Sequence, residues 1–462
     1  MRITLLYPPR PGGGGTNLVP PVGLLYLGAV LEKAGHQVVL LDFTQLEKTG
    51  NDLVKDVVNS DPEVLMISAF TSDVFLLKPI VSILGEVLPK ARLWLGGPHA
   101  SCVEEKAFLD FPRIDAVFLG EAEESVLEAL EFPEVPPAGV IYSGQELKST
   151  RSRQVEDLSS LPIPAWHLAP PEQYRGLPNG VVLKRLPYAP ILTTRGCPYR
   201  CTFCAGFKVT GRKIRHRPLS QVWEEIELLV NDYGVEEIHI EDDNFTFDRS
   251  YAKEFCEIAI RKNLPVLFST PNGVRLDALD DELLSLMKEA GWYVVHCGIE
   301  SGSDRVLKRI QKATTTSEIK KSIELIHSHG LPVAAYFILG LPGETEKDIE
   351  KTIEFARTSG VEWAQFACFL PIPGSPDGDS FLKDNDMVST GWEAFHNAKC
   401  PAPPVSLTAY ELKKLQRRAF MRFYLRPGPM FRATALLFHR DTFFRIIKRG
   451  FSYLFGGRQH NR

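Results

Sequence analysis

Several features of secreted and membrane proteins are absent from this sequence of 462 residues. No apolar run approaches the ~20 residues that a membrane-spanning helix needs. The opening stretch, MRITLLYPP, is a short apolar run that stops at two prolines, which is typical of a strand and not of a signal peptide. The chain has only eight cysteines, and five of them are scattered without the regular spacing of a disulfide framework. These absences predict a cytoplasmic protein with reduced cysteines.

Acidic residues are scarce at the C-terminal end, although the net charge of the whole chain is only −4. Residues 411–462 contain 13 Lys or Arg but only Glu411 and Asp441 as acids, so the remaining residues carry a net charge of −15. From Leu437 to Leu454 the apolar residues mostly fall three, four or seven positions apart, which predicts a helix with one apolar and one basic face. This tail is interpreted either as a helical cap packed on the rest of the chain or as an interfacial helix that gives peripheral contact with an anionic membrane. It has no recognisable nucleic-acid-reading motif, so no nucleic-acid partner is expected.

The first 145 residues alternate short apolar strands with helical patterns. Because near-continuous apolar strands separated by helices indicate a parallel sheet covered on both faces, residues 1–145 are predicted to form a doubly wound, Rossmann-like α/β domain. Ligands of such sheets bind where the strands end, and here those loops are PPRPGGGG, FTSD, GGPHAS and GEAEE. No GxGxxG follows the first strand, which argues against a dinucleotide site. The predicted strands are residues 2–8, 37–43, 64–70, 92–97 and 116–120.

A proline-rich connector over residues 146–186 is followed by a second alternating region, residues 187–375. Six strand–helix repeats in about 180 residues are too few for a complete eight-fold barrel, and they predict a partial (β/α)6 barrel of the TIM type. Residues 376–462 are predicted to be a helical, basic C-terminal region. The strands predicted for the second region are residues 189–195, 236–242, 265–270, 293–299, 332–339 and 363–369, and the helices are residues 219–232, 249–262, 280–290, 303–328 and 345–359.

Three of the eight cysteines occur in the stretch TTRGCPYRCTFCAG, immediately after the first strand of the second region. Cys197, Cys201 and Cys204 are spaced by four and three residues. A structural zinc site closes with four ligands, and neither this spacing nor the nearby His216 supplies an obvious fourth. An iron–sulfur cluster with three protein thiolates leaves one iron open to another ligand, which at the mouth of a barrel points to catalysis. Zinc binding and inert buried thiols are the alternatives.

The cysteine stretch resembles the CxxxCxxC signature of radical S-adenosylmethionine (SAM) enzymes. Three further stretches resemble successive units of that superfamily: RHRPLSQVWEEIELLVNDYGVEEIHIEDDNFTFD, HCGIESGSDRVLKRIQK and FILGLPGETEKDI. The resemblance implies that the three cysteines hold a [4Fe–4S] cluster, and that SAM chelates the fourth iron and is cleaved by electron transfer to a 5′-deoxyadenosyl radical. The family's GGE motif is absent, and Asp243 and Glu300 have an alternative role as caps of the helices that follow them. The SAM contacts implied by the resemblance are Phe203, Asp242, Asp243, Asn244, Glu300, Ser301, Gly340, Leu341 and Pro342.

The N-terminal region resembles the cobalamin-binding domain that precedes the barrel in one branch of this superfamily, through PPVGLLYLGAVLEKAGHQVVLLD, FTSD, GGPHAS and GEAEES. The DxHxxG motif that supplies a histidine to cobalt in other cobalamin proteins is absent. Cobalamin is therefore expected to have no histidine on its lower face, which is either open or occupied by a non-histidine group from residues 69–73. A degenerate, cobalamin-free domain is the alternative, and a methylthiotransferase is not favoured because only Cys102 stands where that family has a second cysteine triad. The cobalamin contacts implied by the resemblance are Pro20, Pro21, Gly23, Phe70, Thr71, Ser72, Gly96, Gly97, His99, Gly120 and Glu121.

Together the resemblances imply a cobalamin-dependent radical SAM enzyme. It would abstract a substrate hydrogen and transfer a methyl group from methylcobalamin, remethylated by a second SAM, to an unactivated carbon. The alternatives are ring closure or rearrangement with the same cofactors, as in anaerobic tetrapyrrole cyclases, and a non-catalytic iron–sulfur electron carrier or sensor. The expected partners are a small-molecule substrate, which is a hydrophobic lipid or tetrapyrrole if the tail contacts a membrane, and an external one-electron reductant such as flavodoxin or ferredoxin. The substrate pocket is expected among the barrel loops and after FLPIPGSP (369–376), and no catalytic side chain is assigned.

Overall fold

The computed structural model describes residues 1–9, 19–44, 50–145, 152–174, 183–384, 392, 395, 402–404 and 406–428. The chain divides into a first unit, Met1–Asn272 with Pro371–His396, and a second unit, Gly273–Leu370 with Asn397–Arg462. The first unit thus combines the N-terminal region with the beginning of the second alternating region. The domain boundaries expected from the sequence stay predictions.

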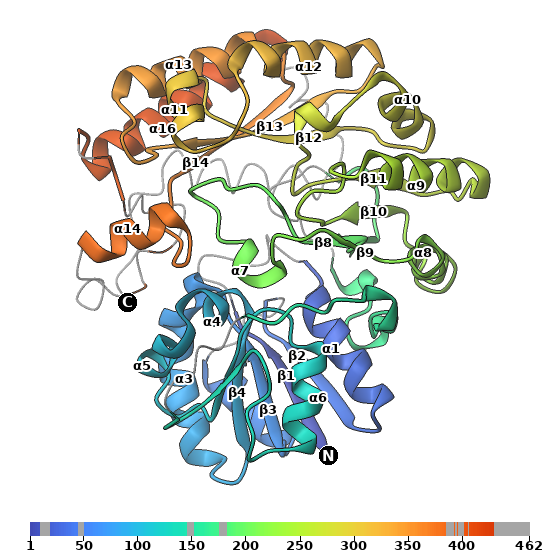
Figure 1. The fold of residues 1–462 in the computed structure, drawn as a ribbon, viewed down its shortest axis with the longest axis vertical. Helices are drawn as coiled ribbons and strands as arrows, with labels where there is room; N and C mark the ends of the chain where they lie inside the picture. The colour runs from blue at the N-terminus through green and yellow to red at the C-terminus, as the bar shows by residue number, and fades with distance from the viewer. Residues whose placement is uncertain are drawn as a thin grey trace. The chain divides into compact units, whose positions relative to one another are not determined.

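The first unit contains a six-stranded sheet in the order β2-β1-β3-β4-β5-β6 (Figure 1). The first five strands are parallel, and each lies within one of the apolar runs predicted from the sequence. The sixth strand was not predicted and pairs antiparallel with β5. The strands are β1 (Arg2–Tyr7), β2 (Gln37–Asp42), β3 (Val64–Ser68), β4 (Arg92–Gly96), β5 (Ala116–Phe118) and β6 (Val140–Tyr142).

Helices cover both faces of this sheet, as its apolar strands require. Buried side chains of α2 to α5 pack on one face, and those of α1 and α6 pack on the other (Figure 1). Helix α4 begins inside the predicted GGPHAS loop, because Gly96 is extended and Pro98 stands in the first turn, where its missing N–H removes no helical hydrogen bond. The helices are α1 (Val22–Lys33), α2 (Gly50–Asn59), α3 (Val74–Val87), α4 (Gly97–Val103), α5 (Ala107–Asp110) and α6 (Glu123–Glu131).

The six repeats predicted for the second region are present as parallel strands followed by helices. Strands β11-β10-β7 form a three-stranded sheet in the first unit, and β12-β13-β14 form another in the second. The strands are β7 (Tyr188–Ile191), β10 (Glu237–Ile240), β11 (Leu267–Ser269), β12 (Val295–Glu300), β13 (Val333–Leu339) and β14 (Trp363–Cys368). The helices are α8 (Leu219–Tyr233), α9 (Arg249–Lys262), α10 (Asp281–Glu289), α11 (Asp304–Arg309), α12 (Thr316–Ser328) and α13 (Glu346–Thr358).

Two predicted elements are divided in the structure. The strand predicted over 189–195 ends early, and its last two residues form a separate strand, β8 (Thr194–Arg195), which pairs antiparallel with β9 (Arg215–His216). The helix predicted over 303–328 is split into α11 and α12. Between them Gln311 and Ala313 have positive φ angles of 55° and 52°, a conformation that a right-handed helix does not contain.

The described part of the proline-rich connector is packed and is not a free linker. Val155, Leu158 and Leu161 are buried in the same cluster as α1 and α6. The indole of Trp166 is buried and donates to the Glu225 carboxylate of α8 at 3.1 Å. The connector therefore joins the N-terminal sheet to the first barrel helix within the first unit.

Helix α16 (Ala409–Tyr424) packs on β14 and α13 in the second unit. Arg418 and Arg422 pair with Glu350 of α13 at 2.8 and 3.0 Å, so the first part of the basic tail is a helical cap that partly neutralises an acidic helix. The apolar and basic helix predicted over 431–455 lies outside the described residues. Within the described ranges, the structure has no helix long and apolar enough to span a membrane. The buried residues of α16 are Leu412, Leu415, Gln416, Ala419 and Phe423.

Among the cysteines that the structure describes, Cys368 departs from the expectation of reduced thiols. Cys368, the last residue of β14, is disulfide-bonded. The expectation is therefore wrong for this residue, because spacing along the chain does not show which cysteines the fold brings together. The cysteines that are free in the structure are Cys102, Cys197, Cys201, Cys204, Cys256 and Cys297.

Candidate active site

The three predicted cluster cysteines lie on a loop whose two ends are held together by β8 and β9. In this short ladder Arg195 pairs with Arg215. Gly196 follows with a φ of +101°, and a Cβ there would lie 2.2 Å from the carbonyl oxygen of Lys213. We call the β8–β9 ladder and the residues beside it the neck of the loop. Only glycine fits at position 196, because any side chain would strain the backbone and collide with the opposite side of the neck. Residues 196–214 form a closed loop, which we call the cysteine loop.

The thiols of the cysteine loop are accessible. Cys197 and Cys201 are half-buried and Cys204 is exposed, whereas Cys256 and Cys297 are fully buried. Burial also raises the pKa of the Cys297 thiol to about 12. Accessibility therefore separates the predicted cluster ligands from the core cysteines.

The donor set of three thiols fits an iron–sulfur cluster, which can take three protein thiolates and leave one iron open. Desolvation of the sulfur raises the pKa of the Cys204 thiol to about 11, although the Gly206 N–H donates to the sulfur at 3.4 Å and opposes the effect. Among the residues that the structure describes, no group of three or more His, Cys, Asp or Glu side chains converges on one ion. A [4Fe–4S] cluster binds each thiolate through a different iron, so its ligands need not converge.

Contacts on both sides hold the cysteine loop in place. The hydroxyl of Thr202 donates to Asp377 at 2.7 Å, and the Asp377 N–H donates back to the Thr202 carbonyl at 2.9 Å. Asp377 belongs to α14, in the segment after FLPIPGSP. Arg212 donates to the carbonyl of Tyr199 at 2.5 Å within the loop. Phe203 is half-buried between the second and third cysteines.

Asp242, the first predicted SAM contact after β10, supports the chain that enters the cysteine loop. Its carboxylate is buried and accepts hydrogen bonds from the N–H and hydroxyl of Thr193 at 2.7 and 2.5 Å. It accepts two more from the N–H and hydroxyl of Thr194 at 2.9 and 2.8 Å. Burial raises the pKa of this carboxyl to about 6 in spite of these four bonds. Both oxygens are thus engaged within the protein.

Asp243 and Asn244 are in different environments. Asp243 is exposed and accepts a hydrogen bond from the Thr210 hydroxyl at 2.5 Å. A Cβ on Gly206 would lie 3.6 Å from both Asp243 and the Cys204 sulfur, so the carboxylate and the thiol flank the same glycine. Asn244 is buried, and neither its amide oxygen nor its amide nitrogen has a hydrogen-bond partner in the described part of the chain.

Further unsatisfied polar atoms lie after the same strands. The buried hydroxyls of Thr246, after β10, and Thr270, after β11, also have no hydrogen-bond partner among the described residues. Because buried polar groups are nearly always hydrogen-bonded, three such residues at the carboxyl ends of adjacent strands indicate a place for a polar ligand. This donor and acceptor set fits SAM, whose amino, carboxylate and hydroxyl groups require such partners.

Glu300 lies at a distorted strand end in the second unit. The register of β12 shifts between Gly298 and Glu300, and Glu300 has a φ of +67°. Its carboxylate is buried and accepts a hydrogen bond from the Lys312 ammonium at 2.8 Å. A non-glycine residue in this conformation is strained, and such strain is concentrated at functional sites. The following residue, Ser301, is fully buried, and its hydroxyl contacts that of Thr352 at 3.1 Å.

The GLPGE turn after β13 is organised by an acid that the sequence analysis did not select. Glu344 is buried and accepts the N–H groups of Gly340 and Leu341 at 2.6 and 3.1 Å. Burial raises the pKa of this carboxyl to about 8. Gly340 has a φ of +85°, and a Cβ there would lie 2.6 Å from the Leu412 side chain of α16. Leu341 is buried and Pro342 is half-buried, so α16 lies against this predicted SAM contact.

The predicted cobalamin contacts follow the carboxyl ends of the parallel strands or lie at the start of α1. Phe70 has 37% of its surface exposed, and Thr71 and Ser72 are half-buried. Gly23 is exposed, and a Cβ there would meet nothing within 4 Å. Gly97 has a φ of +91° and approaches the backbone of Ala69 so closely that a Cβ would lie 2.9 Å from its nitrogen. An exposed aromatic ring and open space beside glycine fit a large, partly apolar ligand. The remaining predicted contacts in this group are Pro20 and Pro21, which are buried, and Gly96 and Gly120, which are half-buried.

His99 and Glu121 are used inside the protein. His99 is fully buried, with Nδ1 at 3.2 Å from the Thr71 hydroxyl and Nε2 at 3.5 Å from the Asp110 carboxylate. Glu121 is also buried, and the Arg215 guanidinium donates to both of its oxygens at 2.7 Å. The sequence did not identify Arg215 as a functional residue, because an arginine in a basic stretch does not show which acidic residue it will pair with.

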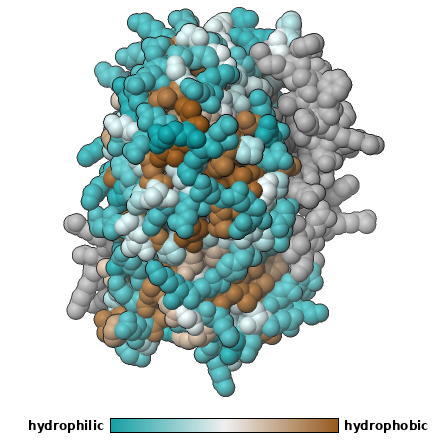
Figure 2. All heavy atoms as spheres, turned by 90° about the vertical axis from the view of Figure 1, so that its right-hand side faces the viewer, coloured by the Kyte–Doolittle hydropathy of each residue, from teal (hydrophilic) through white to brown (hydrophobic). Residues whose placement is uncertain are grey.

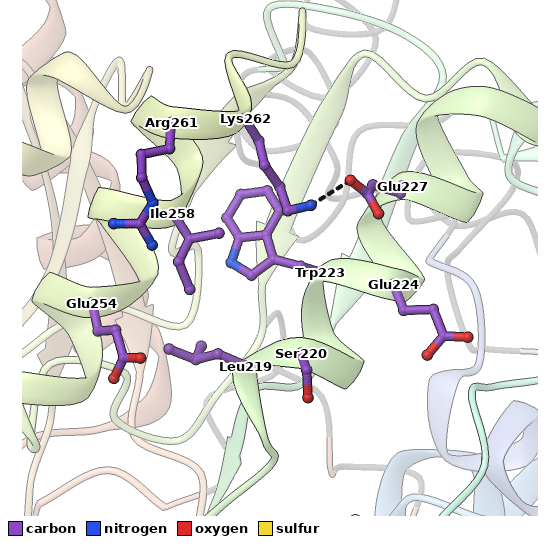
Figure 3. A pocket seen from close by; sticks show the side chains of 9 residues that line it. All are labelled: Leu219, Ser220, Trp223, Glu224, Glu227, Glu254, Ile258, Arg261 and Lys262. Atoms are coloured by element: carbon purple, nitrogen blue, oxygen red, sulfur yellow. Dashed lines mark hydrogen bonds and ion pairs between the residues drawn. The ribbon is translucent and has the colours of Figure 1, made fainter.

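A groove of about 650 Å³ lies on the outer side of the first-unit helices α8 and α9. The face shown in Figure 2 is mostly hydrophilic with hydrophobic patches between the polar side chains, as expected where helices turn their apolar sides inward. Figure 3 shows that the groove is lined by charged side chains together with Trp223, Leu219 and Ile258. It contains none of the predicted site residues, so we do not assign it to cofactor binding.

Comparisons with known proteins agree with this geometry. The radical SAM superfamily matches residues 191–356, and the B12 binding domain matches residues 15–130. An uncharacterized methyltransferase of Pyrococcus horikoshii is 29% identical over 97% of both chains. The cytidylyl-2-hydroxyethylphosphonate methyltransferase of Streptomyces wedmorensis is 32% identical over 77% of this chain and 76% of that protein. An anaerobic magnesium-protoporphyrin IX monomethyl ester cyclase of Rubrivivax gelatinosus is 27% identical over 92% of this chain and 78% of its own length.

A solved structure shares the fold. The radical SAM methyltransferase TsrM from Kitasatospora setae, with cobalamin and a [4Fe–4S] cluster bound, superposes with a TM-score of 0.66 at 18% identity, over 84% of this chain and 79% of that chain. The predicted fold class, a Rossmann-like domain followed by a partial barrel and a helical region, is confirmed. The cofactors of this chain are a [4Fe–4S] cluster, SAM and cobalamin. The chain belongs to the branch of the radical SAM superfamily whose enzymes carry an N-terminal B12-binding domain.

Proposed function

We propose that this chain is a cobalamin-dependent methyltransferase that acts on a small molecule by radical chemistry. The observation that carries the proposal is the accessible thiol triad on a closed loop, in one unit with a B12-binding domain. The reaction class is supported by two relatives named as methyltransferases, at 29% and 32% identity.

The cysteine loop and the neighbouring strand ends would hold the cluster and SAM. The three thiols supply the ligands of the cluster, and Asp243, which flanks Gly206 together with Cys204, is placed to accept from the amino group of SAM. Asn244 has a free donor and a free acceptor for the carboxylate or ribose. When bound, the cluster and SAM supply a hydrogen-abstracting radical, and cobalamin supplies the methyl group.

Within the second unit, Glu300 and the GLPGE turn stay predicted SAM contacts, as the family resemblance implies. Lys312 holds the Glu300 carboxylate at 2.8 Å, which fixes its orientation for a ribose hydroxyl. Glu344 fixes the backbone of Gly340 and Leu341, the part of the turn proposed to approach the adenine. Ser301 and Asp242 are proposed to support these strand ends without touching the ligand, because their polar atoms are engaged within the protein.

Cobalamin is proposed to lie against Phe70, Thr71 and Gly23. His99 is fully buried between Thr71 and Asp110, which supports the expectation that no histidine occupies the lower face of the cobalt. Thr71 or its neighbours would then be the groups that face this side.

Oxidative ring closure with the same cofactors is a second candidate, favoured by the cyclase relative that matches 92% of this chain. The proposal includes a hydrophobic substrate of the lipid or tetrapyrrole type and electron delivery by flavodoxin or ferredoxin. Membrane contact through residues 431–455 is the alternative to a structural cap formed by the same residues. The packing of α16 accounts for only the first part of the basic tail.

The experiment is anaerobic reconstitution with iron, sulfide and cobalamin, followed by incubation with methyl-labelled SAM, a reductant and candidate lipid, tetrapyrrole and antibiotic precursors. We expect mass spectrometry to find the label in one class of precursor. A product that has lost hydrogen and gained no label would favour the cyclase. Substrate turnover that does not require cobalamin would refute both candidates.

A further inference from the structure

We propose that Glu121 and Glu123 anchor the neck of the cysteine loop to the N-terminal domain, and so set where the cluster lies relative to cobalamin. This inference rests on the proposed function, because the position of the cluster relative to cobalamin matters only if the chain binds both cofactors. Both acids follow β5 in the stretch GEAEES, whose resemblance to cobalamin-binding loops suggested a cofactor contact for Glu121. The structure gives this carboxylate a different partner.

The anchoring uses both strands of the neck. Arg215 of β9 donates to the two oxygens of Glu121 at 2.7 Å each, a bidentate pair. Arg195 of β8, two residues before Cys197, donates to Glu123 at 2.7 Å and lies 3.5 Å from Glu121. The two strands that close the cysteine loop are therefore each tied to the N-terminal domain by an ion pair.

All four side chains are buried, with 4–6% of their surfaces exposed. Their charges balance, with two carboxylates against two guanidinium groups. In a buried pair, removal of one partner leaves the other charge without compensation, so each member holds the others in place. A surface ion pair, which water can replace, would not do this.

Arg215 also connects three segments of the chain. Besides Glu121, it donates to the carbonyl of Val155 in the connector and to that of Thr210 in the cysteine loop, at 2.5 Å each. The N–H of Val155 donates to Glu121 at 2.7 Å. The Gly120 N–H donates to the Ser101 hydroxyl at 2.9 Å, which fixes the turn that presents Glu121. The Arg215 guanidinium thus links the cysteine loop and the connector to the N-terminal domain through Glu121.

A neighbouring ion pair provides a matched control. Glu124 and Glu128 of α6 pair with Arg153 of the connector at 2.6 and 2.8 Å. They come from the same stretch of chain, but they are much more exposed, and within the described part of the chain they form no ion pair or hydrogen bond with β8 or β9. Replacement of one of these glutamates tests whether the loss of an ion pair elsewhere in the same stretch also loosens the cysteine loop.

The test begins with hydrogen exchange of the full-length protein without cofactors. In Glu121→Gln and in the milder Arg215→Lys, we expect amides of residues 196–214 to exchange roughly tenfold faster or more, because the neck opens locally. Glu124→Gln should exchange like the parent chain. Unchanged exchange in both neck variants would overturn the anchoring, and so would equal acceleration in all three variants.

The second step measures the distance between the reduced cluster and Co(II) cobalamin by pulsed electron paramagnetic resonance in the reconstituted proteins. We expect a broader distance distribution in Arg215→Lys than in the parent or in Glu124→Gln, with equal iron and cobalamin content. An unchanged distribution would overturn the role in cofactor placement even if the neck opens. If the parent protein binds no cobalamin, the proposed function fails, while the exchange result still decides the anchoring.

Discussion

Replacement of Gly196 by alanine should disable the cysteine loop without touching any cluster ligand. The residue has a φ of +101°, where an L side chain costs about 1–2 kcal/mol. Its Cβ would lie 2.2 Å from the Lys213 oxygen, so the neck must open by about 1.2 Å to restore an ordinary 3.4 Å contact. That movement weakens the bond from the Cys197 N–H to the Gly211 carbonyl, now 3.1 Å, which adds about 1 kcal/mol. We expect a loss of about 2–3 kcal/mol in stability.

Gly234 provides the control for this experiment. It ends α8 with a φ of +63°, and an added Cβ would meet nothing within 4 Å. Gly234→Ala should therefore cost only the conformational strain, about 1 kcal/mol. The assay compares urea unfolding of both variants and the iron bound per chain after anaerobic reconstitution. We expect Gly196→Ala alone to lose most of its iron. Equal iron content in the two variants, or a larger stability loss in Gly234→Ala, would refute the reasoning from the crowded neck.

Four further outcomes are expected. Cys201→Ala should abolish SAM cleavage by removing a cluster ligand, whereas Cys256→Ala, a change in the buried core, should keep the brown cluster; a SAM-cleaving Cys201→Ala protein would end the cluster assignment. Asp243→Asn should weaken SAM binding about tenfold with little change in stability, since its carboxylate is exposed and has a single hydroxyl donor; unchanged calorimetric affinity would remove it from the site. The Co(II) form should show no nitrogen hyperfine splitting in its resonance spectrum, and splitting that vanishes in His99→Ala would contradict the buried position of that ring. Truncation after Pro429 should lower the melting temperature and leave sedimentation with anionic vesicles unchanged at low and high salt; a loss of vesicle binding would favour the membrane helix.

The parallel strands of the six-stranded sheet and of the two three-stranded sheets could be predicted, as could the position of the cysteines, because they depend on local pattern. Apolar runs that become buried form strands slightly shorter than predicted: the strand predicted over residues 64–70 is β3, Val64–Ser68. The cysteine spacing of four and three is itself the signal for the cluster. Residues 303–328 were predicted as one helix because the helical spacing of their apolar residues continues across the break. The positive φ angles at Gln311 and Ala313 do not alter that spacing, so the sequence pattern does not reveal them.

The partners of charged residues could not be predicted, because they are set by tertiary contacts. Asp242 looks like a ligand at a strand end, yet its four hydrogen bonds come from two threonines about fifty positions away. Glu121 meets Arg215, 94 residues further along the chain. Glu344 was overlooked although it lies two residues after Pro342, since a glutamate ahead of a helix is usually interpreted as a helix-terminal charge.

The central claim, that one chain joins radical SAM chemistry to cobalamin, is tested most directly with methyl-labelled SAM, reductant and the reconstituted protein. Mass spectrometry should detect 5′-deoxyadenosine, and it should detect the label in methylcobalamin bound to the protein. In the Cys201→Ala protein the deoxyadenosine should disappear. Deoxyadenosine without any label on cobalamin, from a protein that retains cobalamin, would contradict the claim.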